Sequence, residues 1–347
     1  MDAKDNSTAK KKIFSLDFLR AFFSVCVVLI HLGFIYPSSV FSAGGLGTHT
    51  FTVSDFINFY VLYLAVPIFF LISTYLFALK PFEPLYFRKR IFQLAKLVLF
   101  WSIAYNVYRY TRLKVLEILP DSISGWVKFL LHAGDTVYYF FLSLAILIVI
   151  AHFAKKLSNS YLWIGLVLSL LLLGVLPVLA IRVNEPYLVV FWNPLNFLSY
   201  PFVALLAARY QNQIPNRRTW FLIALVLAVG AALLAILDWT VYLRPEFIPL
   251  EAHALPSYTR PSLVFLTAAV LVLALNVDMK PSRIIGFMSD RSLALYCLHP
   301  FILLFPAIPF IEKWAYPWSL AGDLVVVVLA SYLAAMFLGY FLQEDLL

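Results

Sequence analysis

The stretch LDFLRAFFSVCVVLIHLGF (residues 16–34) is apolar enough to cross a membrane as a helix, yet it carries Asp17, Arg20 and His31. A charged side chain at the bilayer centre costs roughly 2.5–3.5 kcal/mol on insertion scales. Positions 20 and 31 differ by only about 20° in direction on an α-helix and lie about 16 Å apart along its axis. Asp17 and Ser24 fall on the same face. This polar stripe is therefore predicted to face protein or a water-filled cavity rather than lipid.

The composition indicates a membrane protein. Of 347 residues, 63% are hydrophobic and 13% are charged, whereas a soluble domain has roughly 25% charged residues. We predict an all-α polytopic integral membrane protein, with residues 1–347 forming a single transmembrane domain of about ten helices. The apolar runs that are long enough to cross a bilayer lie at 17–36, 57–79, 91–108, 136–153, 161–181, 189–208, 219–237, 259–276, 292–311 and 319–341.

The distribution of Lys and Arg predicts the orientation. If the N-terminus is cytoplasmic, 18 of the 26 Lys and Arg residues fall on the inner side, as the positive-inside rule requires. We therefore expect both termini in the cytoplasm, with residues 1–14 as an N-terminal tail. The same distribution accounts for the net charge of +8, so membrane lipid, and no nucleic acid, is the expected partner.

Arg20 and His31 have complementary chemistry on this topology. A guanidinium at the inner mouth suits phosphate, which it binds bidentately, and a neutral imidazole further out can accept a proton near neutral pH. The pair is typical of a device with a phosphate-bearing donor inside and proton transfer further out. In the alternative interpretation, Arg20 extends to the interface and His31 bonds a neighbouring helix.

The stretch VPIFFLISTYLF (residues 66–77) adds two hydroxyls, on Ser73 and Thr74. They are expected about 9 Å from the inner end of this helix, at a depth between Arg20 and His31. A hydroxyl there could bond a carbonyl or amide of a threaded donor. Alternatively, both side chains bond their own helix backbone.

A basic segment at residues 80–96, expected as a cytoplasmic loop, carries Arg88, Lys89 and Arg90. These residues could form a cradle for the phosphates of a donor. They could equally be the ordinary positive anchors of an inner loop.

The stretch SDRSLALYCLHPFIL (residues 289–303) places Ser289, Ser292, Tyr296 and His299 at spacings of 3, 4 and 3, which is typical of one helical face. His299 is expected at a depth similar to that of His31, as a second cavity-lining histidine or as a packing residue beside Pro300. The six His residues show no tight spacing, so no metal site is expected.

Taken in order, these stretches resemble the acyltransferase-three family of bacterial integral membrane enzymes that acylate sugars. The family's LDxLRxxA…H helix is matched by Arg20 and His31, its vPlFFxiSGyl helix by residues 66–76, and its iYllHpfl helix by residues 295–303. The chain departs from the family pattern in three places. Thr74 replaces a Gly, Gln93 stands where a second Arg often follows the loop Arg, and VYYFF (137–141) replaces HLWFL.

The resemblance implies a transmembrane O-acyltransferase of the bacterial cytoplasmic membrane that modifies cell-envelope polysaccharide. Its donor would be cytoplasmic acyl-CoA, as acetyl-CoA or succinyl-CoA, with no permanently bound cofactor. The acceptor would be a hydroxyl of an extracytoplasmic glycan or lipid-linked sugar. His31 would be the catalytic residue. The expected donor-binding residues are Arg20, Arg88, Arg90 and Ser73, and the residues expected to line the cavity are Asp17, Ser24, Thr74, Tyr296 and His299.

Two mechanisms remain open at this stage. His31 could take the hydroxyl proton as the oxygen attacks the thioester carbonyl, or it could be acylated first and pass the group on. The carboxylate that would orient His31 also stays open, because all five candidates are expected outside: Asp55, Glu185, Asp238, Glu246 and Glu251. A transporter or flippase for a glycan or lipid-linked sugar is the rival class, although no repeated halves are evident.

Overall fold

The computed structural model describes residues 13–32, 53–113, 122–211, 213–214, 216–241, 255–304 and 318–339. These residues form helices and turns, and the described part of the chain contains no strand. The sequence prediction of an all-helical fold is confirmed. The expected N-terminal tail lies outside the described residues as far as position 12, and the first helix, α1 (Phe14–His31), begins at its end.

Within the described residues, six helices are long and apolar enough to cross a membrane, by length and composition. They are α1, a continuous run from Ile57 that ends in α3 (Ala65–Ala78), α4 (Pro84–Leu113), α7 (Asn159–Arg182), α9 (Arg217–Val241) and α13 (Trp318–Leu338). Three shorter apolar helices are α6 (Tyr139–Ala154), α10 (Pro261–Asn276) and α12 (Ser292–Leu303). The chain is therefore a multi-pass membrane protein.

The apolar run expected at 189–208 is not one continuous helix. It begins in short turns, and α8 starts only at Ser199 and ends at Tyr210. Prolines explain the break, because Pro186 and Pro194 each open a single 3₁₀ turn, Pro186–Leu188 and Pro194–Phe197.

Three short elements were not expected from the sequence. They are α2 (Val53–Phe56), which leads into a π-helical turn (Ile57–Val61) and a 3₁₀ turn (Leu62–Leu64); α5 (Ile123–Leu131); and α11 (Arg283–Asp290). The π-helical and 3₁₀ turns lie within the apolar run that ends in α3, so this second span is not α-helical throughout.

The basic segment at 80–96 was expected to be a loop, and this interpretation is wrong. Helix α4 already begins at Pro84, so Arg88, Lys89 and Arg90 lie in its first two turns. Proline is well suited to a first helical position, and Arg, Lys, Gln and Leu in the following turns are good helix formers.

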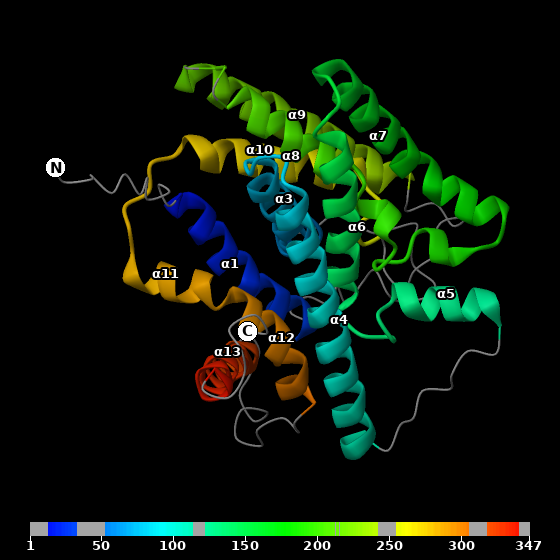
Figure 1. Cartoon of the computed structure of the whole chain (residues 1–347), viewed down its shortest axis with the longest axis vertical. Coiled ribbons are helices and arrows are strands. Elements are labelled where there is room, and N and C mark those ends of the chain that lie inside the picture. The colour runs from blue at the N-terminus through cyan, green and yellow to red at the C-terminus, as the bar shows by residue number, and fades with distance from the viewer. Residues whose placement is uncertain are drawn as a thin grey trace.

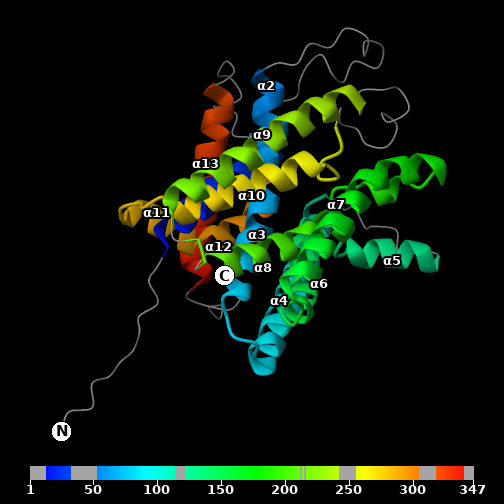
Figure 2. The same ribbon diagram turned by 90° about the horizontal axis from the view of Figure 1, so that it is seen from above.

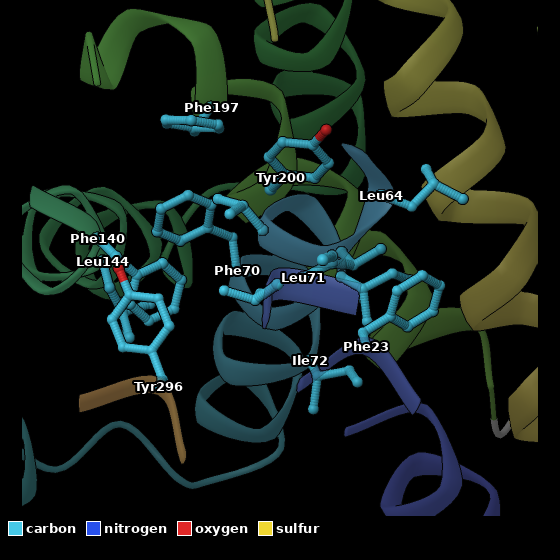
Figure 3. Close-up of a cluster of buried hydrophobic side chains, with 14 of the residues drawn as sticks. Phe23, Leu64, Phe70, Leu71, Ile72, Phe140, Leu144, Phe197, Tyr200 and Tyr296 are labelled. Atoms are coloured by element: carbon cyan, nitrogen blue, oxygen red, sulfur yellow. The ribbon is translucent and has the colours of Figure 1, made fainter. Parts of the chain in front are cut away.

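Helix α3 lies at the centre of the bundle and packs against α1, α6 and α8 (Figure 1). Helices α9 and α10 pack along one another, and α12 packs on α13 (Figure 2). Aromatic rings fill the space around α3 (Figure 3): the Phe70 ring centroid lies 4.6 Å from that of Phe140 and 4.4 Å from that of Phe197. Tyr296 joins this cluster, 5.2 Å from Phe140. These contacts fix α12 against α6, which matters for the site.

Basic side chains cap the C-terminal ends of α3 and α6. Lys155 Nζ donates to the backbone carbonyls of Phe77 and Lys80, at 2.7 and 2.9 Å. Arg209 in turn donates to the carbonyls of Lys155 and Leu157. The last carbonyls of a helix lack partners within the helix, so Lys155 stabilises the end of α3 and Arg209 the end of α6.

Candidate active site

The polar stripe of α1 is held by serines from the junction of α11 and α12. Ser289 Oγ donates to Asp17 Oδ1 at 2.9 Å, and Arg20 Nη2 donates to Ser292 Oγ at 3.4 Å. The helix expected to carry both serines is interrupted at Arg291, so Ser289 belongs to α11 and Ser292 begins α12. Both hydroxyls still reach α1, and Asp17 is buried among protein atoms rather than turned toward lipid.

A cavity of about 790 Å³ opens beside this stripe, a size typical of small-molecule sites. Its walls carry three cations and one carboxylate, together with apolar side chains from α3, α4 and α6. The polar and aromatic lining residues are Asp17, Arg20, Phe69, Ser73, Phe77, Lys80, Tyr86, Arg90, Gln93, Phe140, Phe141, Ser292 and Tyr296. The excess of cations over carboxylates favours an anionic ligand, and the apolar walls suit an uncharged extension of it.

The two arginines proposed as a donor cradle point in different directions. Positions two apart on a helix differ by about 200°. Arg90 lines the cavity and donates from Nη1 to Gln93 Oε1 at 2.9 Å, whereas Arg88 is exposed and does not line the cavity. The sequence interpretation overlooked Gln93 and Lys80 as lining residues. Gln93 could have been found, because residues three apart on a helix are neighbours.

The structure also separates the hydroxyl of Ser73, predicted to bind the donor, from those of Ser24 and Thr74, predicted to line the cavity. Ser73 lines the cavity. Thr74 is fully buried and donates to the carbonyl of Phe70 at 2.7 Å, and Ser24 donates to the carbonyl of Ala21 at 2.8 Å. Both of these side chains bond their own helix, as the alternative interpretation allowed for Thr74, and neither lines the cavity.

Tyr296 connects the cavity to the two histidines. Its side chain lines the cavity, and its ring centroid lies 5.9 Å from that of His299. The His299 ring in turn lies 5.1 Å from His31. Neither histidine lines the cavity itself, but three neighbouring rings lead from the cavity to the His31 end of the α1 stripe.

The carboxylates considered as partners of His31 lie apart from it wherever they are described. Glu185 accepts from Lys128 at 3.2 Å, and Asp238 accepts from Tyr60 at 3.3 Å and from Ser262. The Asp55 side chain, Glu246 and Glu251 lie outside the described residues. Among the residues that the structure describes, no three His, Cys, Asp or Glu side chains gather as metal ligands.

The described residues thus form a multi-pass helical membrane protein with a cation-lined cavity and an adjacent histidine pair. The family model of the acyltransferase-three family, described as an acyltransferase domain, matches residues 13–343. The chain belongs to this family and is a membrane acyltransferase. No curated protein and no solved structure matches it.

Proposed function

We propose that this acyltransferase moves an acetyl or succinyl group from cytoplasmic acyl-CoA to a hydroxyl of an extracytoplasmic glycan or lipid-linked sugar. The observation that carries the proposal is the cavity beside Asp17 and Arg20. Its cations suit the phosphates of acyl-CoA, and its apolar walls suit the pantetheine arm. Arg20 uses one of its five N–H donors on Ser292 within the described residues, and this leaves others for a phosphate.

The same helix carries the proposed base. In this proposal the thioester approaches Tyr296, and the acceptor hydroxyl enters from the His31 end of α1. The His31 imidazole takes the hydroxyl proton while the hydroxyl oxygen attacks the thioester carbonyl. The exposure of His31 supports access by an acceptor, because its side chain is open whereas that of His299 is fully buried.

The proposed location is the bacterial cytoplasmic membrane, with about ten spans and both termini inside. Cysteine labelling tests which side of the membrane each end of α9 faces. Gln213 lies shortly before the start of α9 and Thr240 at its other end, and both are exposed. The native Cys26 and Cys297 are buried. We expect a membrane-impermeant maleimide added to intact cells to label Thr240→Cys and not Gln213→Cys. The opposite labelling pattern would reverse the orientation.

The direct test of function uses purified protein in lipid nanodiscs with radiolabelled acetyl-CoA or succinyl-CoA and glycans extracted from the host envelope. Transfer of one label to a glycan, lost in His31→Gln, is the expected outcome. Hydrolysis without transfer, or transfer to an acceptor that is not a glycan, would contradict the proposed acceptor.

A further inference from the structure

His299 on α12 has an unusual set of contacts for a buried histidine. None of its side chain is exposed, and its Nδ1 lies 3.0 Å from the backbone carbonyl of Leu295, one turn earlier. Its Nε2 is buried and has no hydrogen-bond partner among the residues that the structure describes. An unsatisfied buried polar atom destabilises a fold, so a leucine or phenylalanine would be less costly here if His299 only filled space.

The Leu295 contact determines which ring nitrogen carries the proton. A carbonyl oxygen can only accept, so Nδ1 of neutral His299 is the N–H donor. Nε2 then carries the lone pair and is an acceptor. His299 therefore presents an unused acceptor inside the bundle.

A suitable donor lies beside it. The ring centroids of His31 and His299 are 5.1 Å apart, with 37° between the ring planes. At this separation one nitrogen of each ring can approach to the roughly 3 Å of a hydrogen bond after a small ring rotation. His31 is exposed at the end of α1, whereas His299 is fully buried. The pair therefore has an open side, at His31, and a closed side, at His299.

We propose that His299 is the positioning residue of His31, whose N–H donates to Nε2 of His299. This inference rests on the proposed function, in which His31 is the base. With one nitrogen held by His299, the other nitrogen of His31 is unprotonated and faces the open side, where an acceptor hydroxyl would arrive. His299 thus fills the role that a carboxylate has in many His-dependent sites.

The transfer step balances with His299 exchanging no proton. The acceptor O–H gives its proton to the free nitrogen of His31, the oxygen forms a bond to the thioester carbonyl carbon, and the C–S bond breaks. The leaving thiolate takes the proton back from His31. While His31 carries two N–H groups it is an imidazolium, and its bond to Nε2 is charge-assisted and stronger.

A neutral imidazole suits this position better than a carboxylate does. A carboxylate would carry a permanent charge in the membrane, which costs several kcal/mol unless it is paired. The described carboxylates considered for this role, Glu185 and Asp238, have other partners. An imidazole can orient His31 without placing a second charge there.

The experiment measures the tautomer of His31 directly. In ¹⁵N-histidine-labelled protein, the His31 signals are assigned by their loss in His31→Gln, and we expect one protonated and one unprotonated nitrogen in a single tautomer. His299→Phe keeps a ring of similar size but removes both nitrogens, so the two tautomers of His31 should mix. His152→Phe is the matched control and should leave the His31 signals unchanged. His152 lies in α6, where its ring stacks on that of Phe87 in α4, with the ring centroids 4.0 Å apart.

Two amide variants separate positioning from packing. A Gln at 299 can place an amide oxygen near the position of Nε2, whereas an Asn reaches only the position of Nδ1. His299→Gln should keep a single His31 tautomer and most of kcat. His299→Asn and His299→Phe should lower kcat about 10- to 100-fold, as loss of an orienting partner typically does, with the KM for acyl-CoA unchanged.

A single His31 tautomer in both His299→Phe and His299→Asn would overturn the inference, and so would equal loss of kcat in His299→Gln and His299→Asn. Failure of the proposed function has a different signature. In that case His31→Gln would transfer acyl groups normally, while the tautomer measurement would still report whether His299 holds His31.

Discussion

The two ends of helix α1 have different surroundings. At the Asp17 end, Asp17 and Arg20 line a cavity of about 790 Å³ together with Arg90 and Ser73. At the other end, His31 lies 5.1 Å from the buried ring of His299, and neither ring lines that cavity. One apolar helix therefore borders a cavity at one end and, at the other, carries a histidine that lies beside a second histidine from α12.

The difference shows two ways to keep polar groups in a membrane helix. Asp17 and Arg20 each form a hydrogen bond with a serine hydroxyl, and both side chains also line the cavity. His31 instead is backed by a second histidine, whose Nε2 has no hydrogen-bond partner among the described residues. The first arrangement suits binding, because charge is available without being buried alone. The second suits proton transfer, because a neutral ring can gain and lose a proton.

The largest effect is expected at the His31 end. His31→Gln keeps a hydrogen-bonding amide but cannot accept a proton, and a general base typically contributes about 10²–10⁴-fold. We expect kcat for acyl transfer by purified protein to fall by a factor in this range. Acyl-CoA binding, measured by calorimetry, should be unchanged, since the cavity lies at the other end of α1.

His31→Ala is the control for packing. If the ring were needed only to fill space, Gln would retain most activity and Ala would mainly lower the melting temperature. A His31→Gln protein that transfers acyl groups at the wild-type rate would remove the chemical distinction between the two ends.

The next largest effect is expected at the Arg20 end, and it should appear in binding. Hydrogen bonds to charged groups contribute about 1.5–3 kcal/mol, so Arg20→Ala should weaken acyl-CoA affinity about 10- to 100-fold. Arg20→Lys should restore only part of this, because an ammonium lacks the planar fork of a guanidinium. Unchanged affinity in Arg20→Ala, with folding verified by gel filtration, would leave Arg20 as a topology signal only.

The contrast between the two ends was partly predictable from the sequence. The 3.6-residue period alone places Asp17, Arg20 and His31 on one face, and the structure buries Asp17. The partners of that face could not be read off, because Ser289 and His299 come from segments about 270 residues away whose packing depends on tertiary contacts. The distinction between Arg88 and Arg90 was lost because the segment was interpreted as a loop, in which side-chain direction has no period.

A smaller effect is expected from Arg90, which lies across the cavity from α1. Arg90 already donates to Gln93, so we expect Arg90→Ala to weaken acyl-CoA affinity by less than Arg20→Ala does, about 10-fold for one charge-assisted bond. Arg88→Ala is the matched control, since Arg88 lies two residues away in α4 and is exposed. Calorimetry on both variants tests whether acyl-CoA affinity falls in Arg90→Ala and not in Arg88→Ala. Equal weakening would mean that the donor phosphates reach around α4 beyond the cavity.

The smallest effect is expected on the face of α1 that lies opposite its polar stripe. Phe22 is 43% exposed and stacks on Phe18, whereas its neighbour Phe23 is 4% exposed and belongs to the core. In a membrane the exposed ring contacts lipid, and leucine offers lipid a similar apolar surface, so Phe22→Leu should leave both kcat and the melting temperature unchanged. Phe23→Ala removes a buried ring, a change that costs about 3–5 kcal/mol in protein cores, and should lower the melting temperature clearly. Thermal unfolding of both variants in the same nanodiscs makes the comparison. A loss of stability in Phe22→Leu as large as that in Phe23→Ala would mean that protein, not lipid, covers this face of α1.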